Sequence, residues 1–181
     1  MAIQANINTE REKTSTNSAQ YFTFILAEEE YGLDIRKVVE IRSLEHLTAL
    51  PSAPSYVKGV VNLRGAIIPV ISLRELFHMP DQAETRTTVI IVLQITVNEH
   101  KQVIGVIVDA ASDVYSINPE DIKPKPEICD STGKDFIVGL TAIHQENKQD
   151  KLIILLDETK LLNFNEFKAD VEILEKNHEN N

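Results

Sequence analysis

Short runs of β-branched and aromatic residues, each ended by turn-forming residues, follow one another along most of this 181-residue chain. Such runs are typical of β-strands, and the glycine and proline residues between them mark turns. Roughly ten runs occur, without the regular alternation of strand and helix that builds a parallel α/β sheet. The pattern therefore predicts a mainly β fold of closed or nearly closed barrels, and no clean internal repeat is visible in it.

The first predicted hairpin joins Tyr21–Leu26 to Tyr31–Asp34 through an acidic turn at Glu28–Glu30. The apolar residues of the next segment, Ile35–Ile41, recur near helical spacing, which predicts a short helical turn between strands. We interpret the charges of the acidic turn, like those that follow Leu162, as serving solubility.

The second predicted hairpin has Arg64 and Gly65 at its tip, between the apolar runs Val60–Leu63 and Ala66–Ile71. Glycine at this place allows the positive φ that tight hairpin turns need. Pro69 lies inside the second run and has no amide hydrogen to donate to a neighbouring strand. We therefore expect this strand to lie at a sheet edge or to carry a bulge at the proline.

A third hairpin is predicted in the second half of the chain, from Thr88–Val97 to Lys101–Asp109. Both faces of its Gly105–Asp109 part are apolar, as in a strand that is buried between two layers. Further strands are predicted at Ala110–Ile117, Phe136–Ile143 and Lys151–Leu156.

The C-terminal part of the chain predicts two helices. Asp157 is placed to cap the first one, over Glu158–Leu162, because its side chain can accept a hydrogen bond from the first turn. The second one, over Glu166–His178, is amphipathic because Phe167, Val171 and Leu174 form one apolar stripe. At the other end, residues 1–19 are polar and predict a flexible tail.

Charge and cysteine content limit the classes of partner and site. Eighteen Lys and Arg against 28 Asp and Glu give a net charge of -10, which repels nucleic acid and anionic lipid. We therefore expect no nucleic-acid partner, and contact with a membrane only through another protein. A single cysteine, Cys129, favours the cytoplasm, and the five histidines show no spacing typical of metal ligands. No metal or cofactor is predicted.

Catalytic chemistry has weak support in the sequence. The six glycines are isolated and form no phosphate-binding loop, and no nucleophile is paired with a base. The alternative to a binding protein is a small cytosolic hydrolase or transferase that uses Cys129 or His144. Loss of a measured turnover on Cys129→Ser would support it.

Glu40 and Arg64 are polar residues in strongly apolar surroundings. If the fold brings them together, a bidentate contact between guanidinium and carboxylate would hold the tip of the second hairpin. The alternative is a solvated arginine at an exposed turn, and the residue pattern leaves both open.

Several short motifs occur in a fixed order from Tyr21 to Leu162. The most specific one is the run KGVVNLRG, from Lys58 to Gly65. The others are Phe22–Phe24, Glu30–Ile35, Val38–Ile41, Pro51–Pro54, Ile68–Arg74, Gly105–Asp109 and Leu152–Leu155. Together they resemble the CheW family of bacterial chemotaxis coupling proteins, whereas the long polar start and the acidic end of the chain lie outside the resemblance.

The resemblance implies two small five-stranded SH3-like β-barrels with short helices, a C-terminal helix and a groove between the barrels. It also implies a non-enzymatic adaptor. Such an adaptor links the cytoplasmic tip of a chemoreceptor to the histidine kinase CheA, whose regulatory domain shares this fold. The expected location is the cytoplasm, with recruitment to the inner face of the membrane through receptor arrays.

Seven residues that fall on the matching motifs are expected to bind receptor or kinase. They are Ile35, Val38, Glu40, Gly59, Asn62, Arg64 and Gly65. We expect Gly59 to allow close backbone approach and Val38 to supply apolar contact area. A further kinase contact is predicted around Ile90–Leu93. Arg64→Ala and Gly59→Asp are expected to leave the fold largely intact and to weaken recruitment.

The predicted organisation is a tail over residues 1–19, a CheW-like domain of two β-barrel subdomains over 20–163 and a helical extension over 164–181. A third hypothesis is a hybrid protein that also carries a phospho-acceptor receiver domain. The segment that follows Leu162 is far shorter than a typical domain, so we expect an adaptor that stands alone.

Overall fold

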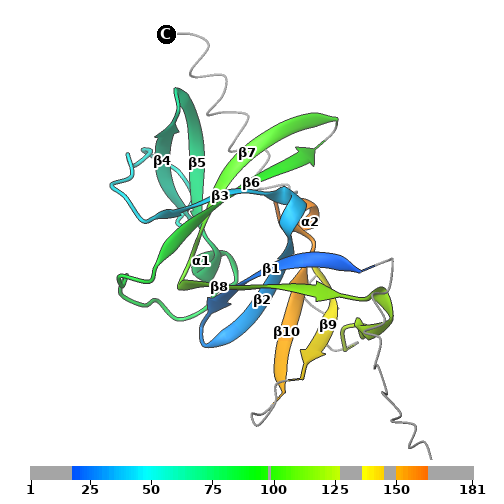
Figure 1. Cartoon of the computed structure of the whole chain (residues 1–181). Helices are drawn as coiled ribbons and strands as arrows, with labels where there is room; N and C mark the ends of the chain where they lie inside the picture. The colour runs from blue at the N-terminus through cyan, green and yellow to red at the C-terminus, as the bar shows by residue number, and fades with distance from the viewer. Residues whose placement is uncertain (1–17, 98, 127–135, 145–149, 163–181) are drawn as a thin grey trace, which may run out of the picture.

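A computed structural model describes residues 18–97, 99–126, 136–144 and 150–162 (Figure 1). These residues form ten strands and few short helices, which confirms the mainly β class. The strands are β1 (Ala19–Leu26), β2 (Glu29–Asp34), β3 (Val38–Ser43), β4 (Val57–Leu63), β5 (Ala66–Ser72), β6 (Val89–Val97), β7 (His100–Val108), β8 (Ala110–Ile117), β9 (Ile137–Ile143) and β10 (Lys151–Leu156). The helices are the 3₁₀ turns η1 (Ile35–Lys37) and η2 (Pro119–Asp121) and the α-helices α1 (Leu73–Leu76) and α2 (Glu158–Leu162).

The described strands form two five-stranded sheets. The sheet that we call lobe A has the order β8-β1-β2-β10-β9, and the sheet that we call lobe B has the order β3-β6-β7-β5-β4. Isolated bridges Thr48–Val60 and Lys123–Leu140 join the segment after one edge strand to the opposite edge strand in each lobe. The two predicted five-stranded units are confirmed, and these bridges favour their closure into barrels, which stays a prediction.

The two halves of the chain repeat one another in structure, although no repeat is visible in the sequence. Each half runs hairpin, strand, hairpin and short α-helix, from β1 to α1 and from β6 to α2. Each half also gives its first hairpin to the other lobe, since β1 and β2 lie in lobe A among strands of the second half, and β6 and β7 lie in lobe B among strands of the first. Each lobe has one parallel pair, β2 with β10 and β7 with β5. The lobes are therefore interleaved and cannot form independently from contiguous halves.

Three apolar clusters follow from this arrangement. One lies inside each lobe, with Val92 and Ile107 in lobe B and Ile153 and Leu155 in lobe A. The third and largest, which we call the interlobe core, joins residues of both lobes, among them Phe24, Leu33, Ile91, Leu93 and Val106. The central strands are thus covered on both faces, as the apolar pattern of Gly105–Asp109 predicted.

The three predicted hairpins are confirmed, with one correction in the first. Its turn is made by Ala27 and Glu28, both with positive φ, whereas Glu30 belongs to β2 and is only 4% exposed. The Glu30 carboxylate accepts hydrogen bonds from Thr23 Oγ1 (2.6 Å) and Ser112 Oγ (2.9 Å) and pairs with Lys151 Nζ. This acid therefore ties four strands of lobe A together, and the interpretation that it serves solubility is wrong.

The prediction for Pro69 is wrong about the edge. β5 lies between β7 and β4, inside the sheet of lobe B. Its pairing with β7 begins at Val70, one residue after Pro69. The missing amide hydrogen of Pro69 therefore costs no hydrogen bond to β7. The bulge lies in β4, between Val57 and Gly59, rather than at the proline.

The segment Ile35–Ile41 combines a helical turn with a strand. Only Ile35–Lys37 are helical, as η1, and Asp34 caps them by accepting a hydrogen bond from the Arg36 amide. β3 then starts at Val38, because the following β-branched residues pair with β6. The predicted helix over Glu166–His178, most of the predicted tail 1–19, and Cys129 lie outside the described residues.

The cap of α2 is confirmed, since Asp157 Oδ1 accepts a hydrogen bond from the Lys160 amide at 2.9 Å. The next residue, Glu158, is a buried acid. Burial first, and then the nearby Asp34 carboxylate, raise the pKa of Glu158 above its ordinary value. The ionised form is therefore disfavoured in the folded protein.

Glu158→Gln is expected to raise the free energy of unfolding at neutral pH by about 1 kcal/mol, because it removes this buried charge. Urea unfolding at several pH values measures it. The folded wild-type protein takes up a proton as the pH falls through the raised pKa of Glu158, so the advantage of the variant should shrink toward acidic pH. An advantage that stays constant with pH would contradict this explanation.

Candidate functional site

The structure brings Glu40 and Arg64 together across lobe B. Arg64 Nη2 donates to Glu40 Oε2 at 2.8 Å, and Arg42 Nη1 lies 3.6 Å from Glu40 Oε1. The predicted contact is confirmed, but a single guanidinium nitrogen makes it rather than two. Arg64 keeps 81% of its side chain exposed, so most of its donors face solvent. An exposed pair of this kind adds little stability and leaves a directional charge on the surface.

Local backbone geometry places Arg64 at the tip of the β4–β5 hairpin. Arg64 (φ 51°) and Gly65 (φ 93°) both have positive φ, as in a two-residue turn whose twist matches the strands. The side chain of Asn62 supports the turn, because its Oδ1 accepts a hydrogen bond from the Gly65 amide at 2.8 Å. Asn62 and Gly65 thus hold the turn that presents the arginine.

Gly59 lies where two backbone segments meet. A Cβ at this position would lie 2.4 Å from the carbonyl oxygen of Thr48, and its φ is +142°. Thr48 and Val60 exchange two backbone hydrogen bonds there, at 3.0 and 2.9 Å. The expected close backbone approach is confirmed. Because any side chain would push these segments apart, the expectation that Gly59→Asp leaves the fold largely intact is wrong.

Ile35 and Val38 lie on the other side of β3 from this ion pair. Both are partly buried and pack against the interlobe core. The seven expected residues therefore form two groups: an apolar one that faces the space between the lobes, and a polar one around Glu40 and Arg64 at the tip of lobe B. The extra kinase contact around Ile90–Leu93 is wrong in its placement, because all four of these side chains are buried.

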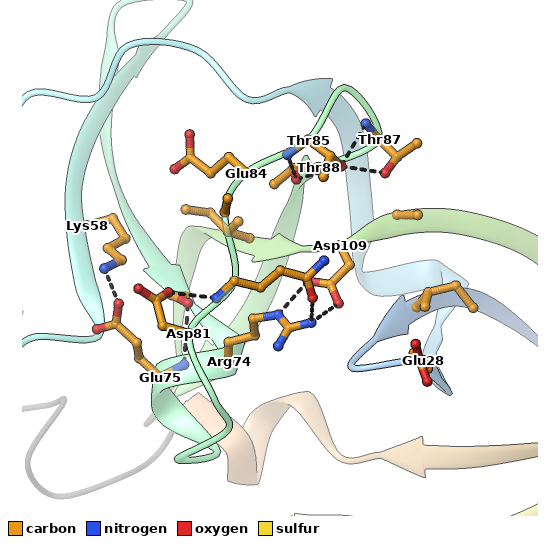
Figure 2. Close-up of a pocket in the computed structure, with 16 residues that line it drawn as sticks. Glu28, Lys58, Arg74, Glu75, Asp81, Glu84, Thr85, Thr87, Thr88 and Asp109 are labelled. Atoms are coloured by element: carbon orange, nitrogen blue, oxygen red, sulfur yellow. Dashed lines mark hydrogen bonds and ion pairs between the residues drawn. The ribbon is translucent and has the colours of Figure 1, made fainter.

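A second polar feature, which the sequence reading missed, lies where the two lobes meet. A hollow of about 500 Å³ opens beside α1, the loop after it and the start of β8. Acidic residues outnumber basic residues on its wall, and Lys58 pairs there with Glu75. Figure 2 shows Arg74 and Asp109 pointing toward one another within this hollow.

Arg74 and Asp109 form the bidentate pair that was expected for Arg64. Arg74 Nε lies 2.8 Å from Asp109 Oδ1 and Nη2 lies 2.6 Å from Oδ2, and the Ala27 amide also donates to Oδ2 at 2.8 Å. Burial would raise the pKa of Asp109, but the hydrogen bonds from Arg74 and Ala27 outweigh it and hold the pKa below its ordinary value. The pair ties α1, the β1–β2 turn and the end of β7 together. A charged residue directly after the apolar residues 103–108 of β7 was the signal in the sequence.

Little in the described part of the chain bears on the hydrolase hypothesis. His144 Nδ1 lies 2.7 Å from Asp150 Oδ1, and both side chains are exposed. Cys129 lies outside the described residues. Among the described residues, no three His, Cys, Asp or Glu side chains gather as a metal site, and no helix is long and apolar enough to cross a membrane.

Comparison with known proteins gives one consistent result. The family model described as CheW-like domain matches residues 20–166. The chain is 38% identical over 163 residues to the chemotaxis protein CheW of Klebsiella aerogenes, covering 90% of this chain and 92% of that protein. It is 36% identical over 143 residues to the probable chemotaxis protein CheW of Rhizobium etli, covering 79% and 86%.

A solved structure agrees with these relatives. The scaffolding protein TtCheW from Thermoanaerobacter tengcongensis superposes with a TM-score of 0.68 at 32% sequence identity. The match covers 82% of this chain and 95% of that one, so it includes nearly all of the fold described above.

Proposed function

Because the chain belongs to the CheW family, we propose that it is a non-enzymatic adaptor that couples chemoreceptors to the histidine kinase CheA. The observation that carries the proposal is the match of the whole CheW-like domain, residues 20–166, to chemotaxis proteins and to a scaffolding protein of known structure. In this proposal the protein binds the kinase and the cytoplasmic tip of a transmembrane receptor, and it reaches the membrane only through the receptor.

The two groups of site residues suit two kinds of contact. Ile35 and Val38 offer apolar area beside the interlobe core, which fits the apolar face of an amphipathic receptor helix. Arg64 offers exposed donors whose direction is fixed by Glu40, which fits a carboxylate on a folded partner such as the kinase regulatory domain. Gly59, Asn62 and Gly65 act indirectly, because they hold the backbone that presents Arg64.

Arg64→Ala is expected to weaken binding of at least one partner about tenfold, the usual range for a charge that is oriented in an interface. The free energy of unfolding should change by no more than about 1 kcal/mol, because the Glu40–Arg64 pair is exposed. Titration calorimetry with the purified kinase regulatory domain and with a receptor-tip fragment measures binding, and urea unfolding measures stability.

Arg86→Ala is the matched control, because Arg86 is an exposed arginine in the loop before β6, away from the hairpin tip. It should bind both partners like the wild-type protein. If neither partner binds the wild-type protein, or if Arg64→Ala binds both with unchanged affinity, the proposed role of this surface is wrong.

A further inference from the structure

β3 carries an exposed apolar surface that none of the described residues covers. Val39 is 49% and Ile41 43% exposed, and with Ile35 and Val38 they form what we call the β3 strip. Val38 pairs with Leu93 and Ile41 pairs with Ile91, and both partners are fully buried in the interlobe core. The strip is therefore the edge at which the interlobe core reaches solvent.

The described chain ends next to this strip. α2 packs on β6, the strand that pairs with β3, and its Leu161 is buried in the interlobe core. Glu158, at the start of α2, interacts electrostatically with Asp34, the cap of η1, and with Lys37, its last residue. A helix of this length extends only about 7 Å, so the chain leaves lobe A near the beginning of β3 (Figure 1).

The segment that follows, residues 163–181, has the pattern to cover the strip. As a helix, its Phe167, Val171 and Leu174 would form one apolar stripe, with Asp170 and Glu175 on either side of it. A helix over Glu166–His178 would be about 20 Å long, which matches the length of about 20 Å expected for β3.

The charges of the two surfaces are complementary. Residues 163–181 contain five acidic and two basic residues. η1, at the start of the β3 strip, carries the basic residues Arg36 and Lys37, and the Arg36 side chain is 80% exposed although it pairs with Asp34. An acidic amphipathic helix would therefore meet basic side chains at one end of the apolar contact, which favours docking and fixes its orientation.

We propose that residues 163–181 dock on the β3 strip of their own chain through Phe167, Val171 and Leu174. Docking covers Val39 and Ile41 and places acidic side chains of the segment beside Arg36 and Lys37. Because Ile35 and Val38 are also expected partner-binding residues, the docked segment competes with the partner. This second consequence rests on the proposed function, whereas the docking itself does not.

Methyl NMR of the full chain tests the docking directly. The probes are the methyl groups of Val39 and Ile41, compared between the full chain and a chain that ends at Leu162. Their chemical shifts should differ between the two, and a peptide of residues 163–181 added to the shorter chain should restore the shifts of the full chain. Identical shifts in both chains, or shifts that move with protein concentration as in a complex of two copies, would overturn the proposal.

Two tail variants separate the apolar stripe from charge alone. Val171→Asp with Leu174→Asp should give the shifts of the shortened chain, because both changes fall on the stripe. Ala169→Asp with Lys176→Gln alters the net charge by the same amount on the opposite side of the helix, and should keep the shifts of the full chain. Equal effects of the two double variants would contradict docking through the stripe.

Partner binding tests the competition separately. The shortened chain should bind the partner that uses the strip about three- to tenfold more tightly, because the binding-competent fraction is no longer reduced by docking. Unchanged affinity alongside NMR evidence of docking would overturn the competition alone. Absence of any partner binding, with docking still observed, would count against the proposed function and leave the docking in place.

Discussion

Gly59→Ala is expected to lower the free energy of unfolding by about 4 kcal/mol, through backbone strain and the loss of hydrogen bonds at the Thr48–Val60 bridge. The φ of +142° is one that an L-residue rarely adopts, and the new Cβ would lie 2.4 Å from the Thr48 carbonyl oxygen. The carbonyl belongs to the backbone, so the clash cannot be relieved by moving a side chain. Urea unfolding followed by circular dichroism measures the change.

Gly65→Ala is the matched control for Gly59→Ala. Gly65 also has a positive φ, +93°, but a Cβ there would have open space around it. Its cost should be only about 1 kcal/mol, that of the unfavourable φ alone. If the two variants lose equal stability, backbone strain rather than close packing against Thr48 sets the requirement for glycine at position 59.

Gly59→Ala should also alter the candidate binding surface around Glu40 and Arg64. Thr48 follows β3, which carries Glu40, and Val60 lies in β4, which leads to Arg64. Separating the two segments at Gly59 therefore moves the partners of the ion pair. Gly59→Ala is expected to weaken partner binding at least as much as Arg64→Ala does, even where the protein is still folded.

Asp109→Ala should lower the free energy of unfolding by about 3 kcal/mol, because it leaves the Arg74 charge in a largely buried place without its carboxylate. Arg74 is only 12% and Asp109 22% exposed, and the Ala27 amide loses its acceptor as well. Glu45→Ala is the control: it removes the hydrogen bond from Arg42 to an exposed carboxylate and should cost no more than about 0.5 kcal/mol. Similar losses of stability in both variants would show that the buried Arg74–Asp109 pair contributes no more than an exposed ion pair.

Acid should remove the contribution of Asp109 in a defined range. Since its pKa is lower in the folded than in the unfolded protein, the ionised form stabilises the fold fully above the ordinary pKa of 3.8. This stabilisation is lost as the pH falls below that value and through the lowered pKa. The stability difference between the wild-type protein and Asp109→Asn should therefore be constant above about pH 5 and shrink below about pH 4. A difference that persists unchanged at pH 2 would contradict this assignment.

Local patterns in the sequence were sufficient for the strands, the three hairpins and the cap of α2. These features depend on neighbours within a few residues: a glycine with positive φ at residue 65, alternation along β4, and an aspartate before the first turn of α2. The errors have a common cause in distant contacts. From the sequence, Glu30 was assigned to an acidic turn, because its contacts with Ser112 and Lys151 join residues that are far apart in the chain. Pro69 was assigned to an edge strand, because the residue at which β5 begins to pair with β7 cannot be predicted from the local sequence.

In the candidate site, too, the contact with a clear local signal in the sequence was predicted and the one without a clear signal was missed. Glu40 and Arg64 stand out locally because each is a charge in an apolar segment, and the structure confirms their contact. Arg74 and Asp109 were missed, although they form the better buried pair with two hydrogen bonds between them. Each fits its own segment, and only the packing of α1 against the end of β7 makes them partners.

By itself, the sequence determined a mainly β chain whose apolar runs must pair, the positions of its turns, and a set of ordered motifs that identify its family. These follow from the preferences of single residues and close neighbours. The tertiary structure alone decided which hairpin joins which sheet. Each half of the chain gives its first hairpin to the other lobe, and these hairpins bury apolar side chains such as Phe24, Leu33, Leu93 and Val106 in one shared core, because burial of apolar area stabilises the fold. The same exchange brings the two lobes together on one interlobe core, whose edge at β3 carries the surface proposed to bind partners.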